Sequence, residues 1–287
     1  MVTLETAPSV EGAPGKREPG RAGRNLPVAI GIGLLLGALI LVPLYSPYPW
    51  TFTIVIVAAM AVGTYEVVKA LQGLGAQPPL LPLLAGGVTM VVLAYRQGTE
   101  LLFVALVLTV LACIVWRLAD PAEGYLRDTA AATFTAVYVP FLISFAALML
   151  VPHDGYKRIT VFIATVVCSD VGGYAVGSLI GRHPMAPTVS PKKSWEGFAG
   201  SVVFCAIGGA LLLHELLHAE LWQGVVFGLA VVATATLGDL GESMVKRDIG
   251  VKDMGTLLPG HGGLMDRLDS LLPTAPVAFL LLQQFLS

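Results

Sequence analysis

The chain has 287 residues, of which 55% are hydrophobic and only 13% charged, and its mean hydropathy is +0.78. Soluble domains carry about 25% charged residues, so this chain has about half the charge that a water-exposed surface needs. The formal net charge of −2 provides no field that would attract nucleic acid. Three well-separated cysteines inside apolar runs do not indicate a disulfide framework. The composition excludes a disordered chain, a nucleic-acid binder and a disulfide scaffold, and it indicates an integral membrane protein.

The first 25 residues differ from the rest of the chain in composition. They are rich in proline, glycine, glutamate and arginine, and they end with a basic group made of Lys16, Arg17, Arg21 and Arg24. We expect residues 1–25 to form a disordered basic tail. The apolar run that follows is longer than the core of a secretory signal peptide, so we expect it to stay in the membrane.

Long apolar runs fill the remaining sequence. Residues 26–65 contain no Asp, Glu, Lys or Arg, and the segment Ser-Pro-Tyr-Pro at 46–49 interrupts them. A helix of about 20 apolar residues crosses a bilayer core about 30 Å thick, so this stretch predicts a transmembrane hairpin. Further spans are expected near residues 79–95, 101–118, 130–151, 159–180, 197–213, 221–240 and 268–285. The fold class is therefore an all-α polytopic integral membrane protein with about nine transmembrane helices.

The basic residues orient this array, because cytoplasmic loops hold Lys and Arg preferentially. With the N-terminus in the cytoplasm, 14 of the 17 basic residues lie on the inner side and only Arg96, Lys157 and Arg158 on the outer side. The polar loops at 181–196 and 241–267 then face the cytoplasm. We expect a multi-pass protein of the cell (inner) membrane, with scaffold helices over residues 26–128 and a catalytic region over residues 129–287.

Ionisable residues concentrate where the eighth predicted span ends and the ninth begins. If the eighth span stays helical, one of its faces carries Asp239, Glu242, Ser243 and Lys246. Asp266 and Asp269 share a face at the next helix start, after glycines that let backbone amides approach a phosphate. Solvated membrane anchors explain single charges at span ends, but they do not require this ordered group. Carboxylates beside cations suit a divalent metal that holds a polyphosphate.

The same region carries a long gapped pattern. Residues 243–269 read S-x-V-K-R, four residues, K-D-x-G, two residues, then L-P-x-H-G-G-L-x-D-R-L-D. Over these 27 positions the chain resembles, without departure, the signature of phosphatidate cytidylyltransferases, also called CDP-diacylglycerol synthases. The segments SPKKSWEG at 190–197 and SDVGGY at 169–174 are also similar to that family. The resemblance extends from about residue 26 to the end of the chain.

The resemblance implies transfer of a cytidylyl group from CTP to phosphatidic acid, which gives CDP-diacylglycerol and pyrophosphate. The lipid phosphate is already an anionic nucleophile, so this reaction needs no general base. Its barrier is dominated by charge, which metals and fixed cations stabilise. The implied cofactor is Mg²⁺, as one ion or two, and the implied partners are the two substrates, membrane lipid and a second copy of the chain in a homodimer.

The resemblance also implies roles for individual residues. The metal ligands are Asp239 and Asp266. The catalytic set adds a supporting carboxylate at Asp269, phosphate-binding cations at Lys246, Arg247, Lys252 and Arg267, and a donor to a phosphate or the leaving group at His261. The substrate-binding set is Asp170, Lys192, Lys193, Ser194, Ser243, Gly262 and Gly263. A charge inside an apolar span, such as Asp170, indicates a functional residue. The alternative is that the span is misplaced and Asp170 lies near the surface. Lys192 and Lys193 suit the binding of either substrate or acidic lipid.

Three other functions stay open at this level. Residues 214–218 read HELLH, a pattern in which His214 and His218 bind zinc and Glu215 acts as general base. An intramembrane zinc protease needs a third ligand, which is not evident, and this motif falls at the outer end of its span. An ion-coupled transporter predicts inverted repeats, whereas the charged motifs lie almost wholly in the second half. A CTP-dependent lipid kinase would share the topology and release CDP.

Overall fold

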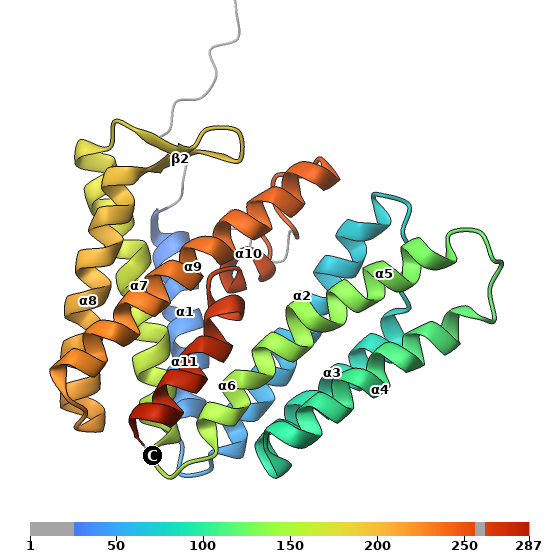
Figure 1. Cartoon of the computed structure of the whole chain (residues 1–287), viewed down its shortest axis with the longest axis horizontal. Coiled ribbons are helices and arrows are strands. Elements are labelled where there is room, and N and C mark those ends of the chain that lie inside the picture. The colour runs from blue at the N-terminus through green and yellow to red at the C-terminus, as the bar shows by residue number, and fades with distance from the viewer. Residues whose placement is uncertain (1–25, 256–261, 287) are drawn as a thin grey trace, which may run out of the picture.

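The computed structural model describes residues 26–255 and 262–286, and within these ranges the protein is helical apart from one small sheet (Figure 1). The elements are α1 (Leu26–Leu44), α2 (Trp50–Gln72), α3 (Leu80–Gln97), α4 (Thr99–Arg117), α5 (Tyr125–Ala136), the π-helix η2 (Val137–Phe141), α6 (Leu142–Leu150), α7 (Gly155–Ile180), β1 (Pro184–Ala186), β2 (Ser190–Ser194), α8 (Trp195–Leu217), α9 (Leu221–Ile249), α10 (Met265–Leu268) and α11 (Leu271–Phe285). The all-α prediction is confirmed. The predicted disordered tail lies outside the described residues.

Seven helical segments in the described part of the chain are long and apolar enough to cross a membrane. They correspond to the second through eighth predicted spans, with α5, η2 and α6 forming one continuous segment. The first and ninth predicted spans correspond to shorter apolar helices, since α1 is assessed only over Gly33–Leu44 and α11 has 15 residues. The helices expose large apolar side chains such as Val107, Leu108 and Leu111 on α4, as expected for a lipid-facing surface. The protein is a multi-pass membrane protein.

Two predicted loops contain more secondary structure than expected. The segment 181–196 forms an antiparallel hairpin in which β1 pairs with β2, and the Trp195 amide donates to the His183 carbonyl oxygen at 3.0 Å. The segment 241–267 begins as helix, because α9 continues to Ile249 and ends at Gly250, whose φ of 78° closes the helix in the left-handed conformation. The helix therefore continues about two turns beyond the span predicted near residues 221–240. The condition for the shared polar face of the eighth span is met.

The helices form two groups that α9 and α11 connect (Figure 1). Helices α7 and α8 pack extensively against each other and α8 packs against α9, while α2 to α6 form the second group. Helix α11 contacts α9 on one side and α6 on the other. A single buried apolar cluster includes Met60 and Leu148 from the second group and Phe227 and Leu272 from the connecting helices α9 and α11. The N-terminal helices are therefore in direct contact with the segments that carry the charged motifs.

Small residues allow α7, α8 and α9 to approach closely. Gly173 and Gly177 face α8, where a Cβ at Gly177 would lie 3.4 Å from the Cα atom of Gly197. Near the middle of α8, a Cβ at Gly228 of α9 would overlap the Cys205 carbonyl oxygen and lie 3.0 Å from the Ala206 nitrogen. Membrane helices pack through such small-residue contacts because the bilayer provides no hydrophobic drive between them.

We expect Gly228→Ala to destabilise the protein, because its methyl group forces α8 and α9 apart at a cost of about 1–3 kcal/mol. The measurement is the apparent midpoint of thermal unfolding in detergent. Gly241→Ala, on the same helix α9, is the matched control, since a Cβ at this position meets no atom within 4 Å. That control should keep or raise the midpoint, because alanine favours a helix by about 1 kcal/mol over glycine. Equal midpoints for the two variants would contradict the packing argument.

Candidate active site

A pocket of about 430 Å³ lies where α7, α8 and α9 meet the β1–β2 hairpin. Four of the predicted substrate-binding residues, Asp170, Lys192, Lys193 and Ser194, line it together with the predicted metal ligand Asp239. Its other lining residues are mostly small or aromatic and come from the same helices. The fold thus brings the segments 169–174 and 190–197 and the end of α9 to one place.

Asp170 lies in the pocket wall and is accessible from it. Its carboxylate interacts electrostatically with the carboxylates of Asp239 and Asp269 and with the cations of Lys193 and Arg267. A charged residue inside an apolar helix is therefore placed beside other charged groups, rather than against lipid. Its role in substrate binding stays a prediction.

The hairpin brings Lys193 onto α9. The Lys193 ammonium group forms an ion pair with the Asp239 carboxylate, which also accepts a hydrogen bond from the Ser243 hydroxyl at 3.5 Å. The hairpin tip is attached to the same helix, since Arg247 Nε donates to the Val189 carbonyl oxygen at 3.4 Å. Arg247 thus contacts the hairpin backbone in this structure, although the sequence predicts a phosphate-binding role for it.

Ser194 has a structural contact besides its place in the pocket wall. It is the N-cap of α8, and its hydroxyl oxygen accepts a hydrogen bond from the Gly197 amide at 3.1 Å. This bond satisfies one of the amides that a helix start leaves without a partner. The hydroxyl therefore fixes the direction in which α8 leaves the hairpin.

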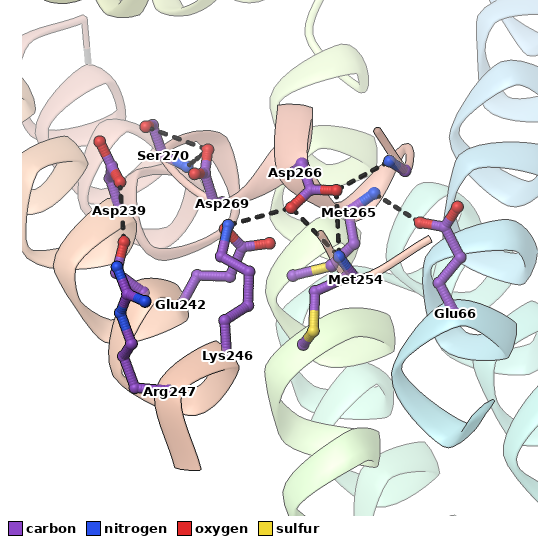
Figure 2. Close-up of polar contacts among 12 residues, drawn as sticks. Glu66, Asp239, Glu242, Lys246, Arg247, Met254, Met265, Asp266, Asp269 and Ser270 are labelled. Atoms are coloured by element: carbon purple, nitrogen blue, oxygen red, sulfur yellow. Dashed lines mark hydrogen bonds and ion pairs between the residues drawn. The ribbon is translucent and has the colours of Figure 1, made fainter. Parts of the chain in front are cut away.

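A second cluster of charges follows the same face of α9 (Figure 2). Lys246 Nζ donates to Glu242 Oε2 at 2.5 Å and to Asp266 Oδ1 at 3.0 Å. Asp266 Oδ2 accepts from the Gly263 amide at 2.7 Å and from the Met254 amide at 3.2 Å. Asp266 therefore joins α9 to the segments on both sides of the undescribed residues 256–261.

Asp269 connects the two clusters. The carboxylate accepts a hydrogen bond from the Ser270 amide at 2.7 Å and interacts electrostatically with Asp239, Glu242 and Lys246. The backbones meet here as well, because a Cβ at position 238 of α9 would overlap the Asp269 carbonyl oxygen. The end of α9 and the start of the last helical segment thus lie at the same end of the bundle, as the sequence predicts.

Unsatisfied polar atoms lie beside these carboxylates. Within the described residues, Glu242 Oε1 and the Tyr138 hydroxyl are buried without a hydrogen-bond partner. Tyr138 belongs to the π-helix η2 and interacts electrostatically with Glu242, Asp269 and Asp239. Sequence reasoning did not identify this tyrosine, although π-helices occur frequently at functional sites. Among the described His, Cys, Asp and Glu side chains, no group of three or more is arranged to hold a metal ion.

Of the remaining predicted residues, all but His261 lie within the described part of the chain. Lys252, just after α9, and Arg267, on α10, are exposed, whereas His261 lies outside the described residues. Gly262 has a φ of 81°, which favours glycine. The Gly263 amide donates to Asp266 rather than pointing into open space, and a Cβ there would lie 2.6 Å from Glu66 Oε2. These glycines make room for carboxylates, and their predicted contact with a phosphate is untested.

Glu66 on α2 is the residue that sequence reasoning overlooked. Its side chain is 4% exposed and accepts hydrogen bonds from the Leu264 amide at 3.1 Å and the Met265 amide at 2.8 Å. Figure 2 shows it on the side of Asp266 away from α9. The available signal was a lone carboxylate in an apolar span, which is costly in a membrane and marks a functional partner.

The HELLH segment has a different geometry from a zinc site. Helix α8 ends at Leu217, and His218 is its C-cap in a left-handed conformation with a φ of 55°. His214 Nδ1 is 3.0 Å from the Ala219 carbonyl oxygen, so this ring contacts the turn. The second histidine has left the helix and does not continue the helical face that a zinc pair requires. The motif lies at the end of α8 opposite the pocket.

Comparison with known proteins agrees with the geometry. Residues 27–285 match a family model described as the cytidylyltransferase family. A phosphatidate cytidylyltransferase of Mycobacterium leprae is 45% identical over 280 residues, which cover 91% of this chain and 89% of the relative. The Mycobacterium tuberculosis protein of that name is 45% identical, with 92% and 84% covered. The chloroplastic phosphatidate cytidylyltransferase 4 of Arabidopsis thaliana is 30% identical, with 87% and 70% covered. The chain therefore belongs to the cytidylyltransferase family.

Proposed function

We propose that the protein transfers the cytidylyl group of CTP to phosphatidic acid, giving CDP-diacylglycerol and pyrophosphate. The supporting observation is a pocket that holds Lys192, Lys193 and Asp239. Asp239 links it to the signature segment, because its carboxylate accepts a hydrogen bond from the Ser243 hydroxyl. The relatives named phosphatidate cytidylyltransferase align over most of their length, which supports the same reaction here. The basic residues favour a cytoplasmic active site in the cell membrane.

The main task of this site is to bring two anions together. Lys192 and Lys193 line the pocket, and Lys246 stands between Glu242 and Asp266 beside it. Fixed cations of this kind stabilise the charge that develops on the transferred phosphoryl group and on the pyrophosphate. The lipid phosphate attacks directly, so the pocket needs to orient it and exclude water rather than remove a proton from it.

The lipid substrate reaches this pocket from the bilayer in our proposal. The pocket lies between α7 and α8, and exposed apolar side chains flank it at Val171, Tyr174 and Leu179. Such side chains suit acyl chains, while the lysines of the hairpin suit the phosphate headgroup. One molecule of phosphatidic acid can thus keep its tails in the membrane while its phosphate enters the site.

Mg²⁺ is the proposed cofactor, with Asp239 and Asp266 as carboxylate ligands. The donor chemistry fits, because Mg²⁺ binds through one or two carboxylates and completes its shell with water and phosphate oxygens. A bound Mg²⁺ would supply Lewis-acid stabilisation of the phosphates. In this structure each carboxylate pairs with a lysine, Asp239 with Lys193 and Asp266 with Lys246. Those lysines would then be available to the substrate phosphates.

We expect purified protein in detergent, supplied with CTP, phosphatidic acid and Mg²⁺, to form CDP-diacylglycerol and pyrophosphate in equal amounts. Chromatography of the lipid product and a coupled pyrophosphate assay measure the two. Release of CDP with a phosphorylated lipid would identify the alternative CTP-dependent lipid kinase. Omission of Mg²⁺ should abolish both products, and activity retained in a chelator would contradict the metal proposal.

Asp239→Asn and Asp266→Asn should each lower kcat by at least about 100-fold, because each removes a carboxylate ligand of the proposed Mg²⁺, whose charge stabilises the transition state. Both proteins should still insert and purify, since the substitution keeps the size of the side chain. Asp248→Asn is the control, because Asp248 is exposed on α9, the helix that also carries Asp239. Full activity in either variant would remove that residue from the mechanism.

The zinc-protease alternative predicts bound zinc. We expect metal analysis of the purified protein to find none in stoichiometric amount, and His214→Ala to keep cytidylyltransferase activity. That variant loses one contact to the turn after α8, worth about 1 kcal/mol. Stoichiometric zinc that disappears in His214→Ala would favour the protease.

A further inference from the structure

Glu66 contacts the signature segment from the other half of the chain. The carboxylate belongs to α2, and the two amides that donate to it belong to Leu264 and Met265, 198 and 199 positions later in the sequence. Each carboxylate oxygen accepts one of these bonds, Oε1 from the Leu264 amide and Oε2 from the Met265 amide. The contact is buried, and it fixes the chain directly before Asp266.

These amides need an outside acceptor. They start α10, and the first amides of a helix have no partner within it. In a capping box the side chain at the third helical position accepts from the N-cap amide, but in α10 this position is Arg267, which has no acceptor. Glu66 supplies the acceptor from α2. An unsatisfied buried amide is costly, so this bond determines where α10 begins.

Glycines in the surrounding backbone leave room for the Glu66 carboxylate. A Cβ at Gly263 would lie 2.6 Å from Glu66 Oε2, and one at Gly255 would overlap Oε1. Gly263 also donates to Asp266 Oδ2 at 2.7 Å. The main chain around Gly255 and Gly263 is thus held between two carboxylates, Glu66 from α2 and Asp266 from the segment itself.

We propose that Glu66 is a positioning residue for the cytidylyl transfer. It holds the main chain at residues 264–265 so that Asp266 and Asp269 meet the charged face of α9. The inference rests on the proposed roles of those two aspartates. Glu66 itself does not line the pocket, and it lies on the side of Asp266 away from α9 (Figure 2).

Glu66→Gln tests this role with little change in side-chain size. Glutamine keeps one oxygen acceptor but turns an NH₂ group toward the second backbone amide, so one bond is lost and two donors oppose each other. We expect kcat to fall about 10- to 100-fold. The KM for CTP should stay within about threefold, because the lysines of the pocket keep their places.

Hydrogen exchange gives a readout that does not depend on activity. In Glu66→Gln the peptide that contains the Leu264 and Met265 amides should exchange at least about tenfold faster, while peptides of α7 and α8 keep their rates. A general loss of stability would instead accelerate exchange throughout. If exchange rises everywhere, or if kcat is that of the wild type, the positioning role is wrong.

Glu100→Gln is the matched control, because Glu100 is an exposed glutamate in the first turn of α4. It should keep wild-type kcat and exchange rates. The wild-type protein separates this inference from the proposed function. If it makes no CDP-diacylglycerol, the function fails, whereas local protection of residues 264–265 by Glu66 is measured independently. Unchanged exchange at those amides in Glu66→Gln would overturn the inference by itself.

Discussion

The structure depends on pairing charged side chains at one end of a bundle that is otherwise apolar. An unpaired ion in such surroundings is costly, and loss of one partner leaves the other uncompensated. Asp239 therefore pairs with Lys193 of the hairpin, and Lys246 pairs with Asp266 of α10. Each pair joins segments far apart in the sequence, so the electrostatic requirement also brings the hairpin and the signature segment onto α9. In the proposed function, the lysines would exchange these carboxylates for substrate phosphates, and the carboxylates would exchange the lysines for a cation.

Local patterns in the sequence account for much of this arrangement. Apolar runs define the spans because a helix must bury its own backbone polar groups in hydrocarbon. The shared face of Asp239 and Lys246 follows from the helical repeat, which holds through Ile249. Polar residues after position 240 lower the hydropathy. Because hydropathy indicates contact with lipid and not helicity, it does not show that α9 continues. The hairpin at 184–194 was not predicted, since its pairing and the contact from Arg247 to Val189 are not encoded in a local period.

Two cases show why a residue cannot be judged by its neighbours in sequence alone. Residues 214–218 satisfy the letters of a zinc motif, yet His218 has left the helix, so the spacing that gives the motif its chemistry is absent. Glu66 shows the reverse, because no motif surrounds it and its partners lie 198 and 199 residues away. The rule that identified Asp170, a lone charge within an apolar span, applies equally to Glu66. The sequence does not show which segment Glu66 contacts, because its partners lie in the other half of the chain.

Contact between the halves explains why the scaffold helices matter to the chemistry. Helix α11 packs on both α6 and α9, and Tyr138 of η2 brings a buried hydroxyl toward the carboxylates of Glu242 and Asp269. Helix α10 is too short to hold its own geometry, since it has four residues and the amides of Leu264 and Met265 at its start have no acceptor within it. Glu66 supplies the missing acceptor from outside. The carboxylates keep their positions only while the two groups of helices keep their placement relative to each other. The N-terminal helices therefore constrain the carboxylates as directly as α9 does.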